Sequence, residues 1–138
     1  MNKSNGWFKQ MTVLITLLVA SGNATAEWVN VASNNLTTLY VDSATIRKKG
    51  GIVKMWSLLN LNKSDTLGGQ PYRSIKTQNE FDCEEELNRM LYNSYHPGNM
   101  GDGKAFAINS NLGEMVPVPP NSGNLILWKI ACGKLKLP

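Results

Sequence analysis

Residues 72–83, YRSIKTQNEFDC, show the clearest alternation of apolar and polar side chains in the sequence. In an extended strand, Ile75, Phe81 and Cys83 share one face with Thr77, because successive side chains point to opposite sides. The other face is expected to be wet and carries Ser74, Lys76, Gln78, Glu80 and Asp82. One buried and one solvated face is typical of an antiparallel sheet, so this stretch predicts a mainly β protein.

Further strands are predicted on both sides of this stretch, from β-branched, aromatic or alternating residues. They are residues 27–31, 36–42, 52–61, 87–95 and 104–108. The segment 52–61, IVKMWSLLNL, is the most apolar and is expected at the centre of the sheet. Residues 84–86 fit a helical turn as well, but a strand is favoured from Leu87. Turn residues predict a hairpin tip at 47–51, loops at 62–69 and 96–103, and irregular chain over 109–120.

The segment 122–132, SGNLILWKIAC, is the best helix candidate, with a strand as the alternative. Ser122 suits the N-cap position, and Gly133 suits the C-terminal stop. Leu125, Trp128 and Cys132 would then stack on one face of the helix. The sequence therefore predicts an α+β, mainly β fold, with an antiparallel sheet of about six strands and a C-terminal helix.

Cys83 and Cys132 are the only cysteines. An even cysteine count in a small exported domain indicates one structural disulfide, which would tether the helix to the buried face of the sheet. A redox pair or a metal-binding pair is the alternative, although the spacing is not C-x-x-C and no other cysteine or histidine lies beside either residue.

The N-terminal 26 residues have the pattern of a secretory signal peptide. Lys3 and Lys9 precede an apolar run at residues 11–20, expected to be helical, and Ala24-Thr25-Ala26 forms an A-x-A cleavage pattern. The run is about half of the ~20 residues that a membrane-spanning helix needs. We therefore expect cleavage after Ala26, an exported domain at 27–138 and no membrane span in that domain.

The net charge of the chain bears on one class of function, nucleic-acid binding. The chain has 138 residues with 14 Lys+Arg and 10 Asp+Glu, a net charge of +4. Loss of Lys3 and Lys9 with the signal peptide leaves 12 against 10, or +2. Such a small excess gives no support for nucleic-acid binding.

No catalytic constellation, cofactor motif or metal-ligand cluster is visible, so the sequence predicts a non-enzymatic protein. The single histidine, His96, lies in a Pro-Gly segment and is expected to be an exposed loop residue. A haem or metal ligand, with Met100 as its companion, is the alternative. The acidic run Glu84-Glu85-Glu86 beside Asp82 is interpreted as a solvated turn.

The candidate partner-binding residues lie around the loop 96–103, because loops held by a rigid scaffold often carry function. They are Tyr92, Tyr95, His96, Met100 and Lys104, with Lys76 and Arg89 as charged contacts. Inward positions are expected to form a core that needs no cofactor. They are Trp56 or Met55, Ile75, Phe81, Leu91 and Trp128.

The order of short motifs along the chain resembles the surface-adhesin protein E family of exported bacterial proteins. The matching residues are Trp28, Tyr40-Val41-Asp42 with Ser43 and Ile46, Val53-Lys54-Met55-Trp56, Tyr72-Arg73-Ser74-Ile75-Lys76, Glu80-Phe81-Asp82-Cys83, Tyr95, Met100-Gly101-Asp102-Gly103, residues 117–122 and Leu127-Trp128-Lys129-Ile130-Ala131-Cys132. They cover almost all of residues 27–138.

The resemblance implies an antiparallel sheet with a disulfide-tethered C-terminal helix and a non-enzymatic role in binding host matrix or serum proteins. The named adhesin resembles a lipoprotein, whereas this chain lacks a lipid-accepting cysteine near the cleavage site. Two roles are therefore expected. One is a binding module at the cell surface or in the secreted fraction that contacts host or envelope proteins. The other is a soluble periplasmic accessory protein for envelope assembly or small-ligand binding.

Overall fold

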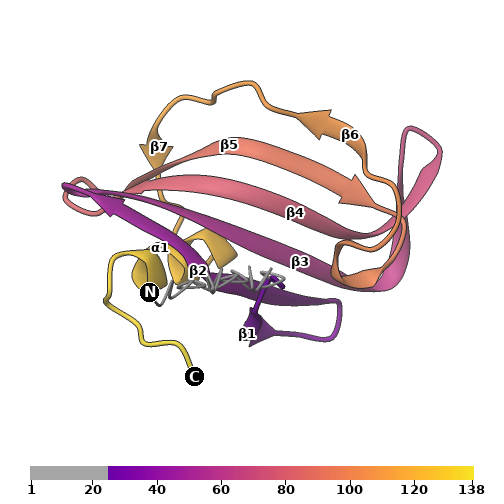
Figure 1. Ribbon diagram of the computed structural model, residues 1–138, viewed down its shortest axis with the longest axis horizontal. Coiled ribbons are helices and arrows are strands. Elements are labelled where there is room, and N and C mark those ends of the chain that lie inside the picture. Colours follow the sequence, from indigo (N-terminus) through magenta and orange to yellow (C-terminus); the bar gives the residue numbers. More distant parts are fainter. Residues whose placement is uncertain (1–24) are drawn as a thin grey trace, which may run out of the picture.

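The computed structural model describes residues 25–138, which form one antiparallel sheet and a C-terminal helix (Figure 1). The signal peptide at 1–26 lies almost entirely outside these residues, and the helix expected at 11–20 lies wholly outside them. In chain order, the elements are β1 (Trp28–Ser33), β2 (Thr37–Lys49), β3 (Ile52–Leu67), β4 (Gln70–Asp82), β5 (Leu87–His96), the 3₁₀ turn η1 (Asn99–Gly101), β6 (Phe106–Asn109), β7 (Val116–Pro117) and α1 (Gly123–Ala131).

The sheet is an up-and-down meander. Its strand order is β1-β2-β3-β4-β5-β6, every neighbouring pair is antiparallel, and β7 pairs with β5 beside the short β6. Figure 1 shows α1 near the end of the sheet where β2 turns into β3, and the η1 loop near the opposite end. The predicted fold class is confirmed.

The prediction of a loop at residues 62–69 was wrong for most of this segment, which forms the end of a strand. Strand β3 continues to Leu67, and Asp65, Thr66 and Leu67 pair with the start of β4. Only Gly68 and Gly69 form the turn, and their φ angles of 56° and 80° fit a tight hairpin connection. Residues 62–67, the end of β3, are exposed on both faces, so they carry no apolar alternation that could have indicated a strand.

The core lies between α1 and one face of the sheet, which we call the inner face. Helix residues Leu127, Trp128, Ile130 and Ala131 pack against Val41, Val53, Met55 and Phe81. The expected core positions Met55, Phe81 and Trp128 are confirmed. Ile75 and Leu91 are half-buried and lie outside this cluster, and Trp56 points to the other face.

The helix forms as predicted and is held at both ends. Ser122 Oγ accepts a hydrogen bond from Leu125 N at 3.2 Å, which makes Ser122 the N-cap. At the other end, Cys132 is bonded to Cys83, with 5.5 Å between their Cα atoms. Trp128 Nε1 also donates to Asp82 O at 2.8 Å, so the end of β4 and the last turn of α1 are joined twice.

Candidate functional site

The face of the sheet turned away from α1, which we call the outer face, is built from regular rows of facing residues. Each row crosses strands β3, β4 and β5 in the observed register. The rows are Lys54–Glu80–Arg89, Trp56–Gln78–Tyr92, Leu58–Lys76–Ser94 and Asn60–Ser74–His96. The expectation that this face is simply wet was wrong, because Ser74 and Glu80 are 0% and 7% exposed.

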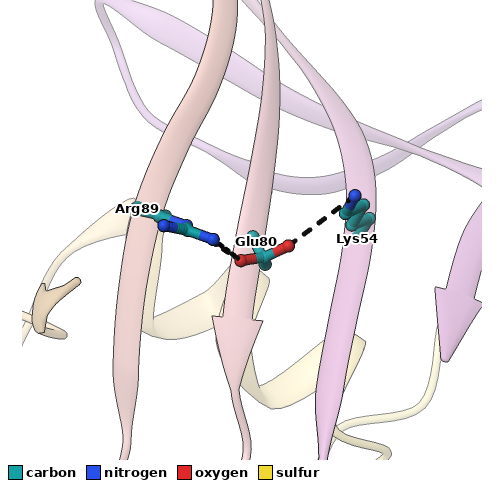
Figure 2. A network of polar contacts seen from close by, with 3 residues as sticks. All are labelled: Lys54, Glu80 and Arg89. Carbon is teal, nitrogen blue, oxygen red and sulfur yellow. Dashed lines mark hydrogen bonds and ion pairs between the residues drawn. The ribbon is translucent and has the colours of Figure 1, made fainter. Parts of the chain in front are cut away.

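Glu80 is a buried carboxylate whose charge is balanced by two cationic side chains, Arg89 and Lys54 (Figure 2). Its Oε1 lies 2.8 Å from Nε and 2.6 Å from Nη2 of Arg89. Its Oε2 lies 3.8 Å from Nζ of Lys54, whose side chain is half exposed. Two cations thus flank one carboxylate, and the network carries a net positive charge at one end of the outer face.

Trp56 and Tyr92 form an aromatic pair in the next row. Their ring centroids are 5.4 Å apart and their planes meet at 63°, the edge-to-face arrangement that aromatic rings prefer. A register shift in the β4–β5 ladder leaves Leu91 without a partner and turns Tyr92 to the face of Arg89. Strict alternation from Arg89 would have placed Leu91 there instead, so the sequence pattern alone could not find this pair.

The far end of the outer face is covered by the segment 97–103. Ser74 Oγ donates to Gly98 O at 2.6 Å and accepts from Gly101 N at 2.9 Å. Asn60 Oδ1 accepts from Met100 N at 2.8 Å. These hydrogen bonds explain why Ser74 is fully buried on a face that was expected to be wet, and they hold Met100 at the surface with 38% of its area exposed.

His96 is the last residue of β5 and is 7% exposed, so its prediction as an exposed loop residue was wrong. Its Nε2 lies 3.0 Å from Ser94 Oγ, and its Nδ1 lies 3.4 Å from Gly103 O. Burial lowers the pKa of His96 below its ordinary value of 6.5, and nearby Lys76 lowers it further, against an opposing effect of the hydrogen bond to Gly103. No cluster of three or more metal-ligating side chains occurs within residues 25–138.

A family model described as surface-adhesin protein E matches residues 28–133, well over half of the chain. The chain belongs to the surface-adhesin protein E family. Membership indicates an exported, non-enzymatic binding protein of the adhesin type, and no helix of the described part of this family member is long and apolar enough to cross a membrane.

Solved structures of protein E from Haemophilus influenzae share the fold of this family member. Crystal form II matches with a TM-score of 0.61 and 16% identity, over 81% of this chain and 91% of that chain. Protein E from non-typeable Haemophilus influenzae matches with a TM-score of 0.59 and 16% identity, over 81% and 79% of the two chains. None of the curated protein sequences matches closely enough to count as a relative.

In this adhesin E-family protein, the predicted partner-binding residues do not form one surface. Tyr92 lies on the outer face, Met100 lies on the loop that covers its end, and Lys104 follows that loop and is exposed. Tyr95 instead faces the inner side, where its ring packs against Tyr72 at 4.9 Å and Phe106 at 6.2 Å. Lys76 and Arg89 lie in the rows on either side of the Trp56–Tyr92 row.

Proposed function

We propose that this adhesin E-family protein is exported, loses residues 1–26 and binds a protein partner through its outer face. The observation that carries this proposal is the half-buried Trp56–Tyr92 pair, set between cationic rows that contain Arg89 on one side and Lys76 on the other. Tryptophan, tyrosine and arginine are the residue types that dominate binding energy at protein interfaces.

The charges on the outer face favour an acidic partner surface. The three rows that begin at Lys54, Trp56 and Leu58 contain three cationic side chains and one carboxylate. The cations are Lys54, Lys76 and Arg89, and the carboxylate is Glu80. Because Glu80 fixes the guanidinium of Arg89 in one geometry, little side-chain entropy would be lost when a partner carboxylate docks there. The partner class is a host matrix protein or a protein of the bacterial envelope.

The loop after β5 extends this surface. Tyr92, Met100 and Lys104 are proposed as partner contacts. Tyr95 and His96 are proposed to have a structural role instead, because Tyr95 packs against Tyr72 and His96 is hydrogen-bonded to Ser94 and Gly103. This division separates two groups of residues that the sequence pattern had placed together.

The proposal is tested with purified protein that begins at Glu27, applied to immobilised matrix proteins and to envelope extract. Trp56→Ala and Tyr92→Ala are each expected to weaken capture by about tenfold or more. Tyr72→Ala is the matched control, because it removes a half-buried tyrosine that contacts Tyr95 and lies outside the aromatic row. Equal capture by the two outer-face variants and the wild type would contradict the proposal.

A role as a periplasmic accessory protein is the second candidate. Both cysteines of the sequence are joined in the disulfide, so neither is available as a lipid-accepting residue. Fractionation separates the two roles. Cleavage of the protein on intact cells by added protease supports surface display, and protection until the outer membrane is opened supports the accessory role.

A further inference from the structure

A groove runs between the first turns of α1 and the inner face of β2–β5, on the opposite side of the sheet from the proposed protein-binding surface. Its volume is about 820 Å³, within the range of about 300–1,000 Å³ that is usual for small-molecule sites. Its walls are Leu39, Leu59 and Met90 from the strands and Leu125, Ile126 and Leu127 from the helix.

The floor of the groove is polar although it is deeply buried. Ser57, Asn79 and Asn88 are only 4%, 6% and 5% exposed, and all three line the groove together with Thr77. Asn88 has partners, since its Nδ2 donates to Val116 O at 3.3 Å and its Oδ1 accepts from Asn124 Nδ2 at 3.4 Å. The polar floor is therefore partly satisfied by the protein itself.

Asn79 is the exception. Its side chain takes part in none of the side-chain hydrogen bonds among the described residues, although it is 94% buried and lines the groove. A ligand in the groove could therefore hydrogen-bond to the Asn79 amide without displacing a protein partner.

The lining also defines the chemistry of that ligand. Among the described residues that line the groove, Lys129 is the only ionisable one, and no carboxylate is present to balance a cation. The floor offers amide and hydroxyl groups, which both donate and accept, while the walls are aliphatic. The backbone groups of the floor strands are already paired in the sheet, so an extended peptide could not dock by strand addition.

We propose that this groove binds an N-acetylated amino sugar, whose acetylated nitrogen carries no positive charge. The acetamido group of such a sugar pairs with the amide of Asn79, its hydroxyls meet Ser57 and Thr77, and its methyl group contacts the aliphatic walls. The proposal concerns a site separate from the outer face, so variants of Trp56 are expected to leave sugar binding unchanged.

The test is calorimetric titration of the protein that begins at Glu27 with the N-acetylglucosamine trimer. Millimolar or tighter binding is expected, and the de-N-acetylated trimer, which is cationic, should not bind. Asn79→Leu should weaken binding by about tenfold or more without lowering the melting temperature, because the residue it removes has no protein partner. Asn111→Leu, the same change at an exposed position, should bind like the wild type.

A second variant keeps the test decisive if Asn79→Leu does not fold. The Cβ of a residue placed at Gly123 would lie 3.5 Å from Cδ2 of Leu39, at ordinary contact distance and within the groove lining. Gly123→Leu should therefore fill the groove and abolish binding. Absence of binding to the wild type, or equal binding to the wild type and Gly123→Leu, would overturn the proposal.

Discussion

Glu80 and Arg89 face each other across β4 and β5, with Oε1 of Glu80 at 2.8 Å from Nε and 2.6 Å from Nη2 of Arg89. The Glu80 side chain is only 9% exposed, whereas those of Arg89 and Lys54 are 27% and 51% exposed. The carboxylate is therefore the buried centre of the network, and its two cationic partners remain partly solvated.

Glu80→Gln should lower the free energy of unfolding by about 1–2 kcal/mol, because a charge-assisted bond is replaced by a neutral one while the shape is kept. Lys54→Met, which removes the more exposed and more distant partner, should cost less than about 1 kcal/mol. Urea denaturation of both variants measures the difference. An equal loss from the two substitutions would show that the network is not centred on Glu80.

Loss of the Cys83–Cys132 disulfide should lower the free energy of unfolding by about 2–4 kcal/mol. The bridge closes a loop with a sequence separation of 49, and release of that constraint increases the entropy of the unfolded chain. The variant Cys83→Ala/Cys132→Ala is compared with the wild type in thermal and urea unfolding. Reductant should destabilise the wild type to the same level and leave the double variant unaffected, and any other pattern contradicts this explanation.

Burial of His96 should make the protein less stable in mild acid. Because the folded-state pKa is lowered, the unfolded chain binds a proton first as the pH falls through about 6.5, and stability decreases until the pH is below the lowered pKa. Above about pH 7 both states are neutral at this residue, and its contribution to stability is fully present.

His96→Gln removes this titration and keeps a polar side chain beside Ser94. We expect the difference in unfolding free energy between about pH 7.5 and pH 5.5 to be larger in the wild type than in the variant. Urea titrations at a series of pH values provide the measurement. Parallel pH profiles for the two proteins would show that His96 is not the titrating group.

The loop that covers the outer face requires glycine at residue 101. Gly101 has a φ of +74°, and a Cβ added there would overlap the Cε of Lys76. Gly68 is the matched control, since its φ is +56° and nothing lies within 4 Å of a Cβ placed there. Gly101→Ala should therefore lower the free energy of unfolding by about 1 kcal/mol more than Gly68→Ala does. Combining Gly101→Ala with Lys76→Ala should remove much of that additional loss.

Local geometry made several features predictable from the sequence. The period of two in residues 72–83 follows from the pleat of an extended chain, and strand β4 contains this stretch. Ser122 and Gly133 bound α1 because helix ends need a side-chain acceptor at the start and a residue tolerant of positive φ after the end. The pairing of Cys83 with Cys132 followed from their number and from export.

The two proposed binding surfaces could not be predicted from local sequence patterns, because they depend on contacts between segments that lie far apart in the sequence. Tyr92 reaches the outer face through a bulge at Leu91, and a one-residue shift in register exchanges the faces of all later side chains in a strand. His96 and Ser74 are buried because the segment 97–103 folds back over them, and Asn79 faces a groove that exists only where α1 stands above the sheet. Local periodicity determined most of the strands and the helix of this protein, whereas the exposed end of β3 and the burial of side chains on each face were decided by long-range pairing and packing, which no local pattern encodes.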